Sequence, residues 1–66
     1  MQITINGKPE EIPAGVTIHE LIERKQISSL HIVIEYNKKI AKRDTWSDTV
    51  LSDGDTLEIL KFVGGG

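Results

Sequence analysis

Apolar and polar residues alternate along the first residues of the chain. Segment 1–5 has the two-residue period of a strand with one buried face. The pair Asn6-Gly7 follows, and it favours a type I′ hairpin turn because both central residues of such a turn need positive φ. A returning strand is predicted at 8–12. It is expected at a sheet edge, because Pro9 has no N–H group to donate to a further strand.

A helical period replaces the alternation after the first hairpin. Thr17 and Glu20 have the spacing of a capping box, in which each side chain accepts a hydrogen bond from the backbone of the other. The helix is expected to end near Gln26, followed by a connection at 27–30. One apolar stripe recurs at helical spacing: Ile18, Leu21 and Ile22. The stripe predicts an amphipathic helix that packs on a sheet.

The second half of the chain predicts three more strands. The strands are expected at 32–36, around 40–41 and at 56–63. Between them we expect a turn at 37–39, one helical turn at 44–48 and a tight turn at 53–55. This order predicts an α+β β-grasp fold, with a mixed sheet of four to five strands and one main helix on one face. The apolar last strand is expected beside the first, at the centre of the sheet. We expect a β-grasp domain at 1–63 and a flexible glycine tail at 64–66.

Composition narrows the possible functions. The chain has 66 residues, a formal net charge of −2 and no cysteine, which excludes a disulfide framework, a thiolate nucleophile and a cysteine-based metal site. Lys and Arg are dispersed, so no nucleic-acid footprint is expected. No apolar run approaches the ~20 residues of a membrane span, and the sequence has no signal-peptide pattern. We therefore expect a single small cytoplasmic domain, monomeric on its own.

The side chains that could perform catalysis do not form a recognisable site. His19 and His31 lie on separate predicted elements, so we interpret both as surface or half-buried imidazoles, with no metal site. The serines lie in loops without an evident base. Asp53-Gly54-Asp55 is explained as a turn. These observations predict a protein that is not an enzyme.

Two features suggest binding to partners. Alternation along the last strand directs Leu60 and Phe62 to the open face of the sheet, and Val33 to the same face. We interpret these three residues as a docking patch, although a buried central strand would have a similar pattern. Trp46 could anchor an interface, but a lone Trp in a small domain is more commonly a lid on the core.

The sequence ends in Gly64, Gly65 and Gly66, which have no side chains. Three extended residues reach roughly 10 Å, and the absence of Cβ atoms would let them enter a narrow channel. The carboxylate of Gly66, with a reference pKa of ~3.3–3.7, is ionised at neutral pH and is a poor electrophile. It would need activation, for which an acyl-adenylate made by an ATP-using partner is the simplest route. A disordered end or an expression scar remains the alternative.

Several motifs together resemble the ubiquitin-like sulfur carriers, and most specifically the thiamin-pathway sulfur carriers of the ThiS family. The resemblance covers essentially the whole chain and departs at Lys42, where the family often has proline. It rests on the predicted β-grasp order, the length and four motifs: Asn37-Lys38-Lys39-Ile40, Arg43-Asp44-Thr45-Trp46, Asp53-Gly54-Asp55 and Phe62-Val63-Gly64-Gly65-Gly66.

The resemblance implies a chain of partners. A ThiF-like adenylyltransferase would use MgATP to adenylate Gly66, a sulfur-relay protein would supply sulfur, and thiazole synthase (ThiG) would accept it from the resulting thiocarboxylate. No cofactor would be bound stably by the carrier itself. Three alternatives stay open: a carrier for molybdopterin or another pathway, a ubiquitin-like modifier that forms isopeptide bonds, and a β-grasp binding module with an inert tail.

Overall fold

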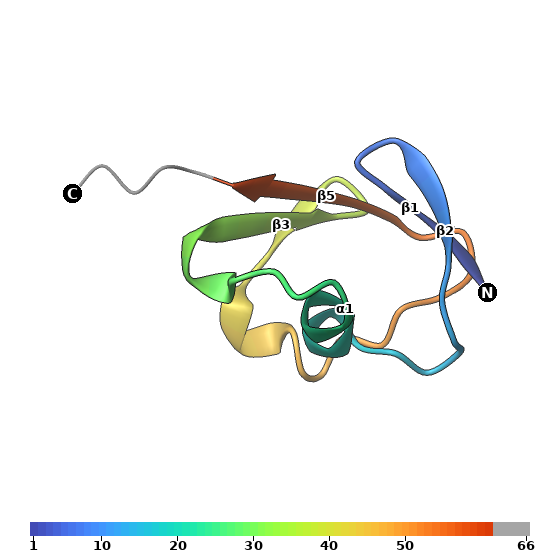
Figure 1. Ribbon diagram of the computed structural model, residues 1–66, viewed down its shortest axis with the longest axis horizontal. Helices are drawn as coiled ribbons and strands as arrows, with labels where there is room; N and C mark the ends of the chain where they lie inside the picture. The colour runs from blue at the N-terminus through green and yellow to red at the C-terminus, as the bar shows by residue number, and fades with distance from the viewer. Residues whose placement is uncertain (62–66) are drawn as a thin grey trace.

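A five-stranded mixed sheet with one helix across one face forms the domain (Figure 1). The computed structural model describes residues 1–61. The sheet order is β2-β1-β5-β3-β4, with β1 and β5 parallel and the other neighbours antiparallel. The elements are β1 (Gln2–Ile5), β2 (Lys8–Glu11), α1 (Ile18–Arg24), the 3₁₀ turn η1 (Ser29–His31), β3 (Ile32–Tyr36), β4 (Lys39–Ala41), the 3₁₀ turn η2 (Arg43–Thr45) and β5 (Thr56–Lys61). This arrangement confirms the predicted β-grasp fold.

Both hairpins turn through residues with positive φ. Asn6 and Gly7 have φ of 51° and 82°, and Asn37 and Lys38 have φ of 48° and 72°. Two successive positive φ values are the requirement of a type I′ turn, which matches the right-handed twist of the paired strands. β2 lies at the sheet edge, as Pro9 predicts.

Helix α1 begins and ends where the sequence predicts. The Thr17 N–H group donates to Glu20 Oε1 over 2.9 Å, and the Glu20 N–H group donates to Thr17 Oγ1 over 3.1 Å, so the capping box is confirmed. The predicted end near Gln26 is confirmed: Arg24 is the last helical residue, Lys25 is the C-cap, and Gln26 leaves the helix with a left-handed φ of 56°. The helical turn expected at 44–48 lies instead at Arg43–Thr45, as η2.

The core fills the space between the sheet and α1. Thirteen apolar side chains of residues 1–61 are buried there, and they include the predicted helix stripe and the alternate residues Leu57 and Ile59 of β5. Trp46 is only 3% exposed, and its Nε1–H group donates to the Ala41 carbonyl over 2.9 Å. Trp46 is therefore a lid on the core. The Arg43 guanidinium lies 5.1 Å from the centre of its ring.

The central position of β5 confirms the predicted topology. β5 pairs with β1 through Thr4↔Thr56 and Ile5↔Leu57, and with β3 from Leu57 to Lys61. The last described pair joins Lys61 to Ile32. The predicted extension of the strand to residue 63, together with Phe62 and the glycines 64–66, lies outside the described residues. The boundary between domain and tail stays a prediction.

Candidate functional site

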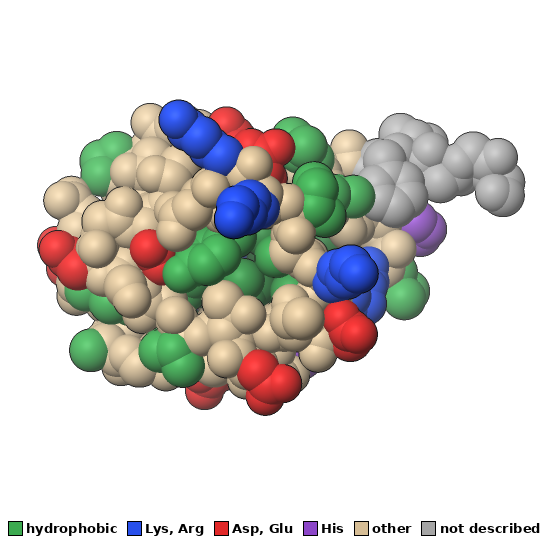
Figure 2. All heavy atoms as spheres, turned by 180° about the vertical axis from the view of Figure 1, so that it is seen from behind, with side chains coloured by type: hydrophobic (Ala, Val, Ile, Leu, Met, Phe, Trp, Pro, Cys, Tyr) green, Lys and Arg blue, Asp and Glu red, His purple; other side chains and the backbone are tan. Residues whose placement is uncertain are grey.

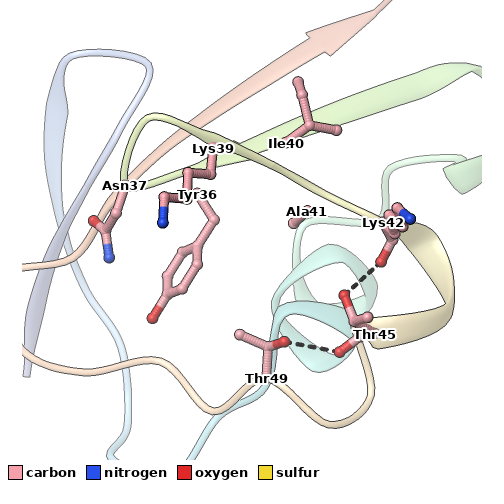
Figure 3. A pocket seen from close by; sticks show the side chains of 8 residues that line it. All are labelled: Tyr36, Asn37, Lys39, Ile40, Ala41, Lys42, Thr45 and Thr49. Atoms are coloured by element: carbon pink, nitrogen blue, oxygen red, sulfur yellow. Dashed lines mark hydrogen bonds between the residues drawn. The ribbon is translucent and has the colours of Figure 1, made fainter.

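The first candidate for a site is a pocket beside β4. On the rear face of the molecule, hydrophobic side chains line a hollow, and Lys or Arg side chains lie beside it (Figure 2). A pocket of about 550 Å³ lies between β4 and the segment around η2 (Figure 3). The residues that line it are Tyr36, Asn37, Lys39, Ile40, Ala41, Lys42, Thr45 and Thr49.

The polar side chains of this pocket are already engaged in local hydrogen bonds. The Thr45 hydroxyl donates to the Lys42 carbonyl over 2.6 Å, and the Thr49 hydroxyl donates to the Thr45 carbonyl over 2.8 Å (Figure 3). The Tyr36 hydroxyl donates to Asp55. The lining includes no histidine or carboxylate. The three hydroxyl groups of the lining are thus all bonded within the fold, and none has an imidazole beside it.

The histidines do not form a site either. His19 lies on α1, with its Nε2 3.6 Å from Glu23 Oε2, and both side chains are largely exposed. His31 lies in η1, on a different element. Within residues 1–61, no three His, Asp or Glu side chains are placed to hold a metal ion. No helix in that range is long and apolar enough to cross a membrane.

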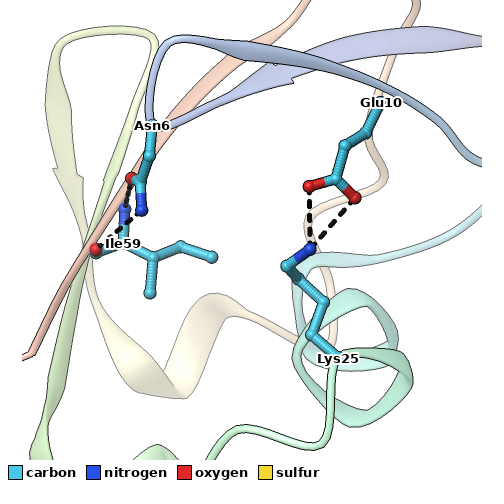
Figure 4. Close-up of polar contacts among 4 residues, drawn as sticks. All are labelled: Asn6, Glu10, Lys25 and Ile59. Atoms are coloured by element: carbon cyan, nitrogen blue, oxygen red, sulfur yellow. Dashed lines mark hydrogen bonds and ion pairs between the residues drawn. The ribbon is translucent and has the colours of Figure 1, made fainter.

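The second candidate is β5, which leads to the glycine tail. A side-chain amide extends its pairing with β1 beyond the end of the backbone ladder (Figure 4). The Ile59 N–H group donates to Asn6 Oδ1 over 2.7 Å, and Asn6 Nδ2 donates to the Ile59 carbonyl over 3.3 Å. The amide of Asn6 thus bonds both backbone groups of Ile59, as a residue of a neighbouring strand would.

The second hairpin turn holds the other end of β5. The Thr56 N–H group donates to Asn37 Oδ1 over 2.9 Å, and Asn37 Nδ2 donates to Asp55 Oδ1 over 3.2 Å. Both type I′ turns of the sheet thus use an asparagine side chain to fix the central strand. The sequence predicted these asparagines only as turn residues, and the pairing of two Asn turns around one strand was not recognised.

Asp55 is a buried carboxylate at the start of β5. The Tyr36 hydroxyl donates to its Oδ2 over 2.6 Å, and the Ser52 N–H group donates to the same oxygen over 2.7 Å. Burial alone would raise the pKa of Asp55, but the bonds from Tyr36, Ser52 and Asn37 outweigh it and lower the pKa. The bond to Asp55, aided by burial and by the charge of Asp55, raises the pKa of Tyr36 to about 12. The sequence indicated only a turn at this position, whereas in the structure Asp55 accepts hydrogen bonds from three residues.

The predicted docking patch is partly assembled in the structure. Leu60 is 51% exposed on the open face of the sheet, and Val33 lies directly opposite it on β3, half-buried. Leu57 and Ile59 face the core, as alternation requires. Phe62, the third predicted member, lies outside the described residues. The docking role of this patch stays a prediction.

Fold and site together define a small β-grasp protein of the ubiquitin-like type. Its central strand is held by two asparagine side chains and is followed in the sequence by a glycine tail. The ThiS family model matches residues 3–66, so the chain belongs to the ThiS family. A crystal structure of the thiamine biosynthesis protein ThiS from Geobacter metallireducens superposes with a TM-score of 0.86. It is 30% identical, and the match covers all of both chains.

Curated relatives include separate carrier proteins and longer proteins. The sulfur carrier protein ThiS of Escherichia coli is 30% identical over 66 residues, which is all of both chains. The Bacillus subtilis ThiS is 36% identical over 65 residues, covering 97% of this chain and 98% of that protein. A thiazole synthase of Paramagnetospirillum magneticum is 32% identical over all 66 residues, but this chain spans only 20% of its length.

Proposed function

We propose that this chain is a sulfur carrier of thiamin biosynthesis that acts as a protein cosubstrate, with Gly66 as the residue that carries the sulfur. The observation that carries the proposal is the position of β5: a central strand, fixed by amide side chains on both sides, runs directly toward the glycines. Relatives of the same family that match along their whole length are named sulfur carrier proteins. Gly64 and Gly65 would supply reach and slenderness for entry into the active site of a partner.

The chemistry of the proposal starts from an unreactive carboxylate. In a ThiF-like adenylyltransferase, an oxygen of the Gly66 carboxylate would attack the α-phosphorus of MgATP, releasing pyrophosphate and leaving an acyl-adenylate. Sulfur at the sulfide oxidation level, delivered by a relay protein, would then displace AMP. One carboxylate oxygen leaves with the AMP, so the net change at Gly66 is the exchange of that oxygen for sulfur. Because the chain has no cysteine, this sulfur must come from another molecule.

Thiazole synthase is the proposed sulfur acceptor. The supporting observation is that two thiazole synthases, from Paramagnetospirillum magneticum and Magnetococcus marinus, contain a region that matches this whole chain, which spans 20% of their length. In those proteins the ThiS-like region and the remaining four-fifths are one polypeptide. A covalent link of this kind raises the effective concentration of two modules that act together. The cytoplasmic location expected from the sequence belongs to the same proposal.

Mass spectrometry tests the proposal directly. The purified chain is incubated with its adenylyltransferase, ATP and a sulfur source. The expected result is a mass gain equal to the exchange of one oxygen for one sulfur, localised to Gly66. A variant with one alanine added after Gly66 is the control and should gain no sulfur. No gain in the unmodified chain, when the E. coli carrier is converted under the same conditions, would refute the proposal, and a lysine conjugate would instead indicate a modifier.

A further inference from the structure

Two glutamates lie directly opposite each other on the open face of the sheet. The β3–β5 register pairs Glu35 with Glu58. The pair Val33 and Leu60 lies two residues away along each strand, on the same face of the sheet. Directly opposed side chains on neighbouring antiparallel strands have Cβ atoms about 4.5–5.5 Å apart, and like charges in such positions are destabilising. Glu58 is exposed and Glu35 is half-buried.

No ion pair within residues 1–61 involves either glutamate. The ion pairs in that part of the chain join Glu10 to Lys25, Glu11 to the N-terminus and Glu23 to His19. Neither Glu35 nor Glu58 has a side-chain hydrogen bond or ion pair with any described residue. The folded chain alone therefore gains nothing from holding the two carboxylates together. An arrangement that costs stability is typical of surfaces retained for function.

Apolar side chains frame the two carboxylates. Leu60 and Val33 lie beside them along the strands, and Ile40 lies opposite Glu35 on β4. Ile40 is 62% exposed and Leu60 is 51% exposed, which is high for large aliphatic side chains. Exposed aliphatic side chains of this kind mark surfaces that other proteins bind, and the charges among them then favour a partner of opposite sign.

We propose that this face, defined by Glu35, Glu58, Ile40, Leu60 and Val33, docks a thiazole synthase surface that places an arginine between the two carboxylates. A planar guanidinium can bond two carboxylates at once through its fork of N–H groups, which a compact ammonium does less well. The like-charge cost of the free carrier becomes an attraction in the complex, because a positive charge then sits between the glutamates. Apolar side chains of the partner would cover the aliphatic frame.

The inference rests on the proposed function, because it names the acceptor of that function as the partner. Charge complementarity sets the sign of the partner surface: two carboxylates without an ion-pair partner favour a positively charged group. The choice of thiazole synthase rests on the relatives in which the matching region shares one polypeptide with thiazole synthase.

The experiment measures binding of the purified carrier to the thiazole synthase of the same organism by titration calorimetry. We compare the wild-type chain with Glu35→Gln, Glu58→Gln and the double variant. Asp48→Asn is the matched control, because it removes one exposed carboxylate from the loop after η2, away from the open face. Each Gln variant should bind roughly tenfold or more weakly, and Asp48→Asn should bind as the wild type does. Binding of the wild type should weaken with added salt more steeply than binding of the double variant.

Stability gives the second readout. Because the opposed charges repel, Glu58→Gln should melt at the same temperature as the wild type or higher, so weaker binding cannot be a consequence of unfolding. Glu58→Gln and Glu35→Gln variants that bind as tightly as Asp48→Asn would overturn the inference, while sulfur transfer by the wild type would leave the proposed function standing. A wild-type chain that gains sulfur but does not bind thiazole synthase would overturn the inference and the proposed acceptor together.

Discussion

Asn6 and Ile59 are 53 residues apart in the chain, yet the side chain of Asn6 bonds both backbone groups of Ile59. Asn6 therefore has two functions: its positive φ forms the first hairpin turn, and its amide continues the sheet where the β1 ladder with β5 ends. Asn37 does the equivalent at the second turn. The strand that leads to the glycine tail is thus held from both sides by side chains, which favours a rigid base for the tail.

Replacing Asn6 with glycine separates these two functions. Asn6→Gly keeps a residue that adopts positive φ easily, but it removes both hydrogen bonds to Ile59. We expect a loss of about 1–2 kcal/mol in the free energy of unfolding, because two part-buried backbone groups lose their partner. Urea unfolding followed by circular dichroism measures the change.

Lys38→Gly is the control for Asn6→Gly. Lys38 also has a positive φ, 72°, but its side chain makes no hydrogen bond or ion pair with the rest of residues 1–61. Relief of the left-handed strain should leave its stability unchanged or slightly higher. Equal stability of Asn6→Gly and the wild type would show that the amide bonds contribute nothing.

The bond between Tyr36 and Asp55 predicts two pH windows of stability. The pKa of Tyr36 is raised from 10.0 to about 12 in the folded chain, so its contribution is present below pH 10.0 and is lost as the pH rises toward about 12. The pKa of Asp55 is lowered from 3.8, so its contribution is present above pH 3.8 and is lost as the pH falls below it. Urea unfolding across both windows measures these losses.

Tyr36→Phe is the variant that assigns the alkaline window, because Tyr36 is the only tyrosine in the chain. Near neutral pH it should lose on the order of 1–2 kcal/mol, as expected for a hydrogen bond to a charged group. Its stability should then fall less steeply than that of the wild type above pH 10.0. Parallel alkaline curves for the two proteins would show that the bond to Asp55 does not hold the phenol neutral.

Trp46→Phe tests the assignment of Trp46 to the core. The change removes the hydrogen bond to the Ala41 carbonyl and leaves a void under the loop around η2. We expect a loss of about 2 kcal/mol in the free energy of unfolding, with no loss of partner affinity in the fraction that remains folded. Arg43→Gln, which removes only the cation above the ring, should cost less than about 1 kcal/mol. Weaker binding at unchanged stability would assign Trp46 to an interface.

Local patterns predicted most of the fold because they need only neighbouring residues. The Asn-Gly turn and the Thr17–Glu20 capping box are completed within four residues, and alternation along β5 correctly assigned Leu57 to the core and Leu60 to the open face. The exact last residue of α1 could not be predicted, because Gln26 adopts its left-handed φ without a glycine at that position to indicate it.

Long-range side-chain contacts could not be predicted in the same way. The partners of Asp55, Tyr36 and Asn37, lie 19 and 18 residues away, and their meeting depends on the register between β3 and β5. The opposition of Glu35 and Glu58 depends on the same register, and a shift of one residue would move one of them to the core face. The shared face of Leu60 and Val33 could be predicted, because it needs only the alternation of each strand.

Leu60→Asp tests that patch. Leu60 is half exposed, so a carboxylate at this position stays in water in the free carrier, and we expect a change in the free energy of unfolding below about 0.5 kcal/mol. In the complex the same carboxylate would be buried among apolar groups and beside Glu58, and the affinity for thiazole synthase should fall roughly a hundredfold. Binding and thermal melting are measured on the same preparation.

Val50→Asp is the matched control for Leu60→Asp. Val50 is 54% exposed, but it lies in the loop that bridges to Thr17, away from the open face of the sheet. The two variants add the same charge to equally exposed aliphatic positions, so non-specific electrostatic effects on the partner should be alike in both. Only Leu60→Asp should lose affinity and slow the transfer of sulfur from Gly66, because only Leu60 lies on β5 next to the tail that must reach the partner. Equal losses in both variants would show that net charge, and not the open face, governs binding.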